Sequence, residues 1–268
     1  MRPLRVGVLC SRRAPGLTHL LDGDPHRGRL YEVVCCLTSE DSCAEAPAAA
    51  DRGVPMLVHP IRAFCRARGV RLADPDARAA YDRETVARLT PYRVDLVVLA
   101  SYLYVLSAPM LAAFRDRIIN VHHGDLTLRH RDGTPRLPGL RAVGDALAAG
   151  ADETRATVHL VTEKLDQGPP FLRSWPFPVS PLVADAVRDR AADVFKAYAW
   201  AHQEWMIRAT WGPLLARAIE LVADGRVALP ALARTGDEDL QPPWDLDEAG
   251  RLHGSGPLPE MDVDVRIA

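Results

Sequence analysis

Amide, imidazole and carboxylate side chains gather at the end of a strongly apolar run, residues 117–121. Asn120 lies near the end of this run, and His122, His123 and Asp125 come directly after it. Alternate residues of a strand share a face, so Asn120 and His122 point to the same side. Together they can hold a carbonyl oxygen and respond to negative charge that develops on it. Taken alone, these residues fit a polar cap at a strand end equally well.

A second apolar run, residues 157–162, leads into a loop that contains Asp166 and Gly168. If this loop returns toward His122, a carboxylate beside the imidazole fixes its tautomer and raises its basicity. We therefore predict a catalytic set of Asn120, His122 and Asp166. His159 lies inside the run and fits a core or supporting histidine better than a ligand. His122, His123 and Asp125 are too close in sequence for a convincing metal site, so no metal is predicted.

The elements that must position these residues follow an α/β pattern. Short runs rich in Val, Ile and Leu alternate with helix-period stretches, which predicts a Rossmann-like, mostly parallel, doubly wound sheet. Residues 76–89 form the clearest amphipathic helix. The predicted strands are residues 5–10, 31–38, 56–59, 95–100, 117–121, 157–162 and 171–179. Ligands of such sheets gather at the carboxyl ends of the strands, where the polar residues above are found.

The C-terminal third is predicted to be helical and then irregular. A helix begins after Ser180-Pro181, and Gly212-Pro213 should break or kink it before a segment that ends at Asp224-Gly225. The last residues from Met261 alternate in polarity, as an edge strand does. The helix from Val183 and the tail after Met261 could bury surface between subunits of a homo-oligomer.

Composition excludes several classes of protein. The chain has 268 residues, 48% of them hydrophobic, and a net charge of −2, so neither nucleic acid nor a membrane is an expected partner. Five cysteines without a C-x-x-C pair indicate a reducing compartment, with Cys10 a small buried hydrophobe. The apolar N-terminal stretch is too short for a signal peptide, and we expect a cytoplasmic protein.

The sequence contains several short motifs whose order along the chain is distinctive. They are Asp-Leu-Val-Val-Leu-Ala (95–100), Leu-Ser (106–107), Arg-Ile-Ile-Asn-Val-His (117–122), Pro-Gly-Leu (138–140), Thr-Val-His-Leu-Val-Thr (157–162) and Leu-Asp-Gln-Gly-Pro (165–169). In this order the chain resembles the folate-dependent formyltransferase family over residues 4–230. That family includes glycinamide ribonucleotide formyltransferase and formyltetrahydrofolate deformylase.

The resemblance implies a formyl transfer that uses 10-formyltetrahydrofolate, with Asn120, His122 and Asp166 as catalytic residues. It implies a catalytic domain over residues 1–225, divided into an acceptor-side half (1–100), a folate and catalytic half (101–180) and C-terminal helices (181–225). A Pro-rich extension, residues 226–268, follows. The implied folate-binding residues are Tyr102, Leu103, Tyr104, Val105, Leu106, Val161, Thr162, Leu165 and Gly168. The implied acceptor-binding residues are Ser11, Arg12, Arg13, Gly16, His123 and Asp125.

One departure from the family bears on the acceptor and another on the folate. Glycinamide ribonucleotide enzymes hold the substrate phosphate on a glycine-rich turn after the first strand, but residues 11–16 here are Ser-Arg-Arg-Ala-Pro-Gly. Arg12 and Arg13 either meet an anionic acceptor group such as a carboxylate or lie in solvent. Tyr104 stands where the family more often has a basic residue near the glutamate tail of the folate.

We therefore expect an N-formyltransferase whose small-molecule acceptor is an amine other than glycinamide ribonucleotide, such as a sugar, an amino acid or a specialised metabolite. A formyltetrahydrofolate deformylase is the first alternative. That branch usually carries an additional N-terminal domain, for which the first predicted strand, at residue 5, leaves no room. A non-catalytic folate-binding relative is the second alternative.

Overall fold

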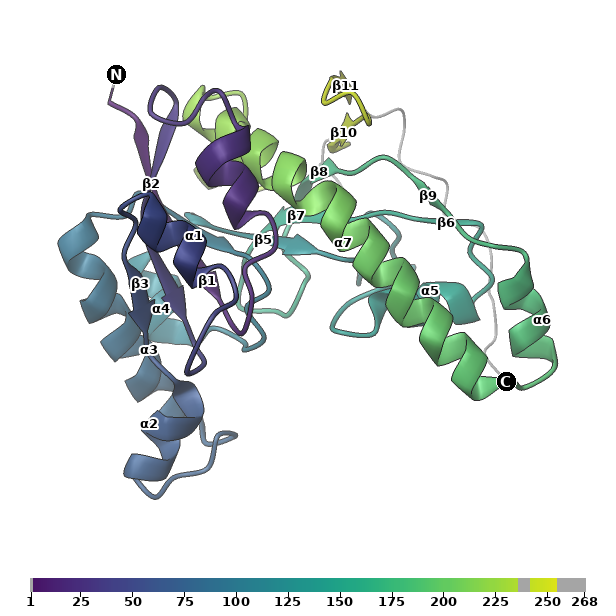
Figure 1. Ribbon diagram of the computed structural model, residues 1–268, viewed down its shortest axis with the longest axis horizontal. Coiled ribbons are helices and arrows are strands. Elements are labelled where there is room, and N and C mark those ends of the chain that lie inside the picture. The colour runs from purple at the N-terminus through teal and green to yellow at the C-terminus, as the bar shows by residue number, and fades with distance from the viewer. Residues whose placement is uncertain (1, 236–241, 255–268) are drawn as a thin grey trace.

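A twisted nine-stranded sheet runs through the computed structural model, which describes residues 2–235 and 242–254 (Figure 1). The strand order is β11-β10-β8-β7-β5-β4-β1-β2-β3. The strands of this sheet are β1 (Leu4–Cys10), β2 (Tyr31–Thr38), β3 (Met56–Val58), β4 (Leu96–Leu99), β5 (Ile118–His122), β7 (Thr157–Leu160), β8 (Pro170–Arg173), β10 (Trp244–Leu246) and β11 (Leu252–Gly254). A separate two-stranded sheet pairs β6 (Glu153–Thr154) with β9 (Phe177–Pro178).

The first five strands of the large sheet are mutually parallel, as the sequence predicts. β1 pairs with β2 and β4, β2 with β3, and β4 with β5, all in the parallel sense. β7 is antiparallel to β5, and β8 is antiparallel to β7. The mostly parallel α/β fold is thereby confirmed, with a reversed strand at the point where the chain returns past Asn120.

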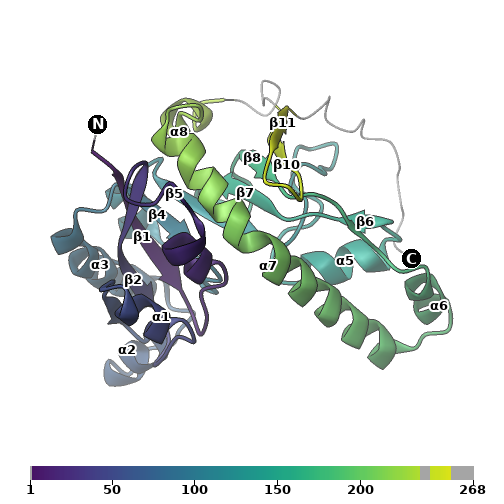
Figure 2. The same ribbon diagram turned by 45° about the horizontal axis from the view of Figure 1, so that its top comes forward.

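Helices cover both faces of the sheet, so the cores of the central strands β1, β4, β5 and β7 are buried from two sides. On one face, α3 (Pro75–Leu89) and α4 (Ala108–Ala113) enclose a core that includes Val97 and Ile118. On the other face lie the π-helix η1 (His19–Gly23), α1 (Ala46–Asp51), α5 (Ala142–Ala148) and α7 (Ala192–Ala223). Figures 1 and 2 show α7 running diagonally across this second face. The remaining helices are α2 (Ile61–Ala67), the 3₁₀ turn η2 (Thr90–Tyr92), α6 (Leu182–Arg188) and α8 (Leu229–Leu232).

A break or kink is predicted at Gly212-Pro213, and the break was wrong, because α7 continues through Pro213 to Ala223. A proline inside a helix costs about 3 kcal/mol through its missing N–H and its steric clash. Here the residues around it are buried, Trp211 and Leu214 among them, and their packing offsets that cost. The chain instead interrupts its helix earlier, between α6 and α7, where Arg190 has a φ of +53°.

The C-terminal region differs from the expected irregular extension where it is described. β10 adds to the sheet beside β8, and β11 forms the edge. The strand predicted from Met261 lies outside the described residues. The predicted strand over 171–179 is two strands, β8 and β9, which belong to different sheets.

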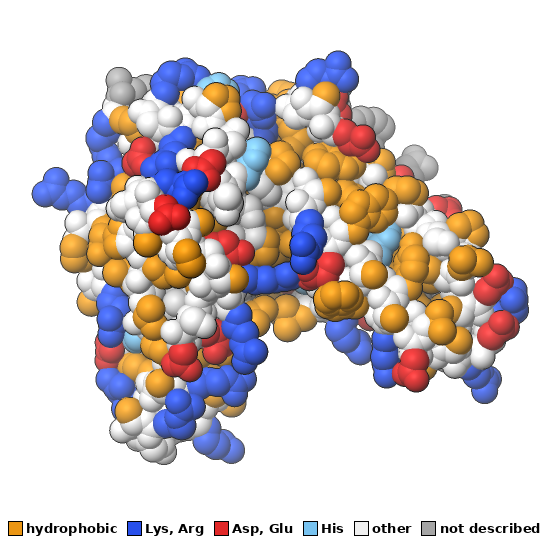
Figure 3. All heavy atoms as spheres, in the orientation of Figure 1, with side chains coloured by type: hydrophobic (Ala, Val, Ile, Leu, Met, Phe, Trp, Pro, Cys, Tyr) orange, Lys and Arg blue, Asp and Glu red, His pale blue; other side chains and the backbone are white. Residues whose placement is uncertain are grey.

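Exposed apolar side chains lie over α7 (Figure 3), and they include Val194, Trp200 and Trp205. The homo-oligomer stays a prediction. Within the described residues, no helix is long and apolar enough to cross a membrane. All five cysteines are buried free thiols.

Candidate active site

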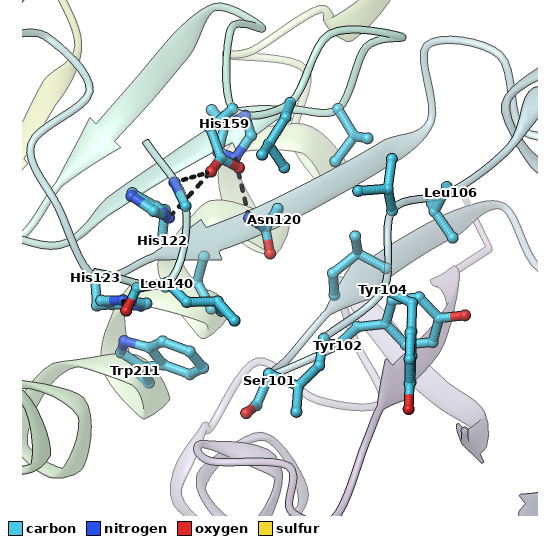
Figure 4. A pocket seen from close by; sticks show the side chains of 18 of the residues that line it. Ser101, Tyr102, Tyr104, Leu106, Asn120, His122, His123, Leu140, His159 and Trp211 are labelled. Carbon is cyan, nitrogen blue, oxygen red and sulfur yellow. Dashed lines mark hydrogen bonds and ion pairs between the residues drawn. The ribbon is translucent and has the colours of Figure 1, made fainter. Parts of the chain in front are cut away.

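A cavity of about 700 Å³ opens at the carboxyl ends of β1, β4 and β5. Figure 4 shows Asn120, His122 and His159 along its inner side, Ser101, Tyr102 and Tyr104 on one wall, and His123, Leu140 and Trp211 on the other. Its size lies within the range of small-molecule binding sites. Asp166 also lines it, so the three residues predicted as catalytic meet in one cavity.

Asn120 is held by His159, its direct neighbour across the β5–β7 pair. His159 is buried, and its Nδ1 lies 3.0 Å from the carbonyl oxygen of Leu160, which can only accept. Burial lowers the pKa of His159 and keeps its ring neutral, so Nδ1 donates and Nε2 accepts. The Nδ2 of Asn120, 3.1 Å from that Nε2, must therefore donate to it. This fixes the amide of Asn120, and no other group among the described residues bonds to its second N–H.

His122 is held at one ring nitrogen, and its other ring nitrogen faces a carboxylate. Its Nε2 lies 2.8 Å from the carbonyl oxygen of Leu137, so Nε2 carries a proton, and Nδ1 faces Asp166 Oδ2 at 3.7 Å. Burial lowers the pKa of His122, and the Asp166 carboxylate acts in the opposite direction. The result is a neutral ring whose free lone pair, on Nδ1, lies beside a carboxylate that stabilises a proton placed there.

Asp166 is positioned by a folded-back loop rather than by a strand. Its φ of +52° lies in the left-handed region, which a non-glycine residue adopts only where its surroundings compensate. The backbone N–H of Gly139 donates to Oδ2 at 2.7 Å, and His159 Nε2 lies 3.7 Å from Oδ1. Gly168 presses against Leu160, where an added Cβ would lie only 1.8 Å from the carbonyl oxygen. Gly168 therefore shapes this loop and does not line the cavity.

Exposed apolar side chains surround the cavity on the side predicted to bind folate. Leu103 is 49% exposed, Val105 58% and Leu165 53%, which is unusual for large apolar residues that lie together. Tyr102, Tyr104, Leu106, Val161 and Thr162 complete this wall. Tyr104 donates from its hydroxyl to Glu40 Oε1 at 2.8 Å, so it closes the rim instead of presenting a charge.

Comparisons with known proteins now identify the family. The Formyl transferase family model matches residues 4–217. The chain belongs to the formyl transferase family. A phosphoribosylglycinamide formyltransferase of Mycobacterium tuberculosis is 35% identical over 177 residues, 66% of this chain and 72% of its own length. A formyltetrahydrofolate deformylase of Bacillus subtilis is 35% identical over 97 residues, 36% of this chain and 30% of its own.

The solved structure of glycinamide ribonucleotide transformylase 1 from Symbiobacterium toebii superimposes with a TM-score of 0.61 at 30% identity, covering 84% of this chain and 90% of that one. The trifunctional purine biosynthetic protein adenosine-3 of Drosophila melanogaster is 31% identical over 203 residues. That match covers 75% of this chain, but the chain spans only 13% of the length of that protein.

The residues predicted to bind the acceptor are placed unevenly. Arg12, Arg13 and His123 line the cavity. Ser11 lies beneath it, where its Oγ accepts from the backbone N–H of Leu103 at 3.1 Å and bonds with the Oγ of Ser39 at 2.8 Å. Burial lowers the pKa of His123 to about 4, so its ring is neutral. Asp125 lines a second cavity, of about 370 Å³, where it pairs with Arg173.

Sequence reasoning missed several residues that line the cavity, and three of them lie on α7. Gln203, Ile207 and Trp211 are four residues apart and share one face of the helix. Their spacing was visible in the sequence, but nothing there brings α7 to the ends of β1 and β5. His159 was predicted only as a core or supporting residue, and the structure adds that it orients Asn120.

Gly16 shapes the turn after β1 from outside the cavity. Its φ is +88°, and an added Cβ would lie 3.0 Å from the backbone of Trp211 and Gly212. We expect Gly16→Ala to lower the free energy of unfolding by about 2–4 kcal/mol, measured by denaturant unfolding. Gly28→Ala is the matched control, because Gly28 has a φ of +79° and open space around an added Cβ. Equal losses in the two variants would contradict the close packing of Gly16 on α7.

Proposed function

We propose that this formyltransferase moves a formyl group from 10-formyltetrahydrofolate to an amine other than glycinamide ribonucleotide. The observation that carries the proposal is the meeting of Asn120, His122 and Asp166 in one cavity, with Asn120 held by His159. The exposed apolar wall around Leu103 and Val105 fits a flat heteroaromatic ring that would cover it. The small-molecule substrates and a cytoplasmic location belong to the same proposal, and the free thiols fit a reducing compartment.

Each of the three residues has a defined part in the transfer. The free N–H of Asn120 donates to the formyl oxygen as the bond between the amine nitrogen and the formyl carbon forms and negative charge develops on that oxygen. His122 accepts the proton of the attacking amine at Nδ1, and Asp166 stabilises the resulting imidazolium. His122 then returns the proton to the departing nitrogen as the old carbon–nitrogen bond breaks. Tetrahydrofolate and a formylated amine result.

Glu45 supports the part of the proposal that concerns the acceptor. Its Oε2 accepts from the backbone N–H of Ala14 at 2.6 Å, so a carboxylate of the protein itself occupies a donor of the turn that follows β1. Pro15 has no N–H to offer. Glu204 pairs with Arg13. Two groups that could receive a phosphate at this turn, the Ala14 N–H and Arg13, are therefore already engaged by carboxylates of the protein, which disfavours glycinamide ribonucleotide.

The test is tetrahydrofolate release from 10-formyltetrahydrofolate, measured with and without added amines. We expect slow release alone and rapid release with an accepted amine, together with a formylated product identified by mass spectrometry. Glycinamide ribonucleotide should be a poor acceptor. Rapid release without any amine would favour the deformylase alternative. No release under any condition, despite binding of the folate, would favour the non-catalytic relative.

A further inference from the structure

The helix α7 forms one wall of the cavity, on the side predicted to bind the acceptor. This wall changes from polar at Gln203 to apolar at Ile207 and Trp211. Gln203, Ile207 and Trp211 lie on one face of the helix and span about 12 Å at 1.5 Å per residue. Figure 4 shows the ring of Trp211 beside His123 and Leu140, close to the catalytic side chains. Leu140 is 66% exposed although it lines the cavity. The part of the acceptor next to its reacting amine thus meets apolar surface.

At the Gln203 end of this wall, the described residues engage the side chain of Arg13 but not that of Arg12. Both terminal nitrogens of Arg13 donate to the carboxylate of Glu204. Glu204 and Glu45 both raise the pKa of Arg13. Arg12 also lines the cavity and is exposed. Within residues 2–235 and 242–254, its guanidinium makes no hydrogen bond or ion pair. The side-chain amide of Gln203 is likewise free among these residues.

We propose that the acceptor is an amine with an apolar body and a single carboxylate, the body lying on Ile207, Trp211 and Leu140 and the carboxylate binding Arg12. This rests on the proposed transfer function. One guanidinium matches one carboxylate, and the planar pair forms two parallel hydrogen bonds. A group with two negative charges would gain the same partner, but it would find Arg13 and the Ala14 N–H already engaged by Glu204 and Glu45. An acceptor amine without a carboxylate would form no ion pair with Arg12.

Matched acceptors test the proposal directly. Aminohexanoate and para-(aminomethyl)benzoate are compared with their carboxamides and with the corresponding phosphonates, in the presence of 10-formyltetrahydrofolate. For the wild type we expect kcat/KM to be about tenfold or more higher for the carboxylates than for the carboxamides. In Arg12→Gln that preference should disappear through a higher KM with little change in kcat. Arg12→Lys should keep part of this preference, because lysine retains the positive charge but cannot form the two parallel hydrogen bonds of a guanidinium.

Arg115→Gln is the matched control, because Arg115 is exposed and lies outside the cavity lining. Calorimetric binding of the same carboxylates and carboxamides to wild type and Arg12→Gln gives a readout that needs no turnover. Equal binding and use of carboxylate and carboxamide by the wild type would overturn the proposal. So would a preference for the phosphonates, or an equal effect of Arg12→Gln on all acceptors. If amines of other chemistry release tetrahydrofolate while these preferences are absent, the transfer function stands and the carboxylate acceptor does not.

Discussion

Asn120→Ala should lower kcat by about 10²- to 10³-fold, which corresponds to the loss of one oxyanion donor. Asn120 lines the cavity from β5, and the N–H that His159 does not engage is the donor that we propose for the formyl oxygen. Its contribution arises as charge develops on the formyl oxygen, so KM for 10-formyltetrahydrofolate should change little. Steady-state release of tetrahydrofolate, with a saturating amine, measures the effect.

Folding should be nearly unaffected in the same variant. Asn120 is half-buried, and its loss leaves only His159 Nε2 without a donor, at a cost of about 1 kcal/mol. The melting temperature should therefore fall by only about 2–4 °C. Thr90→Ala is a suitable control, because Thr90 is exposed and donates only to the Val86 carbonyl oxygen. A kcat within tenfold of the wild type, in a folded Asn120→Ala protein, would show that another group stabilises the oxyanion.

Local pattern was sufficient for part of this site. Strand alternation over residues 117–122 places Asn120 and His122 on one side, and the structure has them so on β5. The apolar runs also predict six of the strands to within two residues at each end. Such signals are local, since they depend on side chains a few residues apart in the chain.

The contacts that complete the site are not local. The antiparallel direction of β7 puts His159 opposite Asn120, and neither run carries a mark of that direction. Glu45 reaches the turn from a separate loop, and α7 reaches it from almost two hundred residues away in the chain. The sequence predicts a break or kink at Pro213, but the burial of α7 outweighs the local free-energy cost of a proline inside a helix. The short strands β10 and β11 depend on an edge already formed by β8.

The pH dependence of Asp166→Asn separates the two ways in which His122 can act. As the acceptor of the amine proton, His122 must be neutral, so kcat/KM rises as pH increases through its pKa and is then level. Asp166 raises that pKa against the lowering effect of burial. Replacing the carboxylate therefore lowers the pKa further, and the acidic limb of the profile should move to lower pH. At the same time the imidazolium loses its counter-ion, so kcat should fall on the order of 10²-fold.

The profile would be measured from about pH 5 to about pH 9, the range around the ordinary titration of histidine. Asp166→Asn keeps an oxygen that can accept from the Gly139 N–H, so the loop should stay folded. Asp145→Asn, on the surface of α5 beside Arg141, is the matched control and should leave the profile unchanged. His159 also faces Asp166, but it holds its proton on Nδ1 toward Leu160 and takes none from the amine. If His122 instead acted as a cation, activity would fall as pH rises through its pKa, and Asp166→Asn would bring that loss to lower pH.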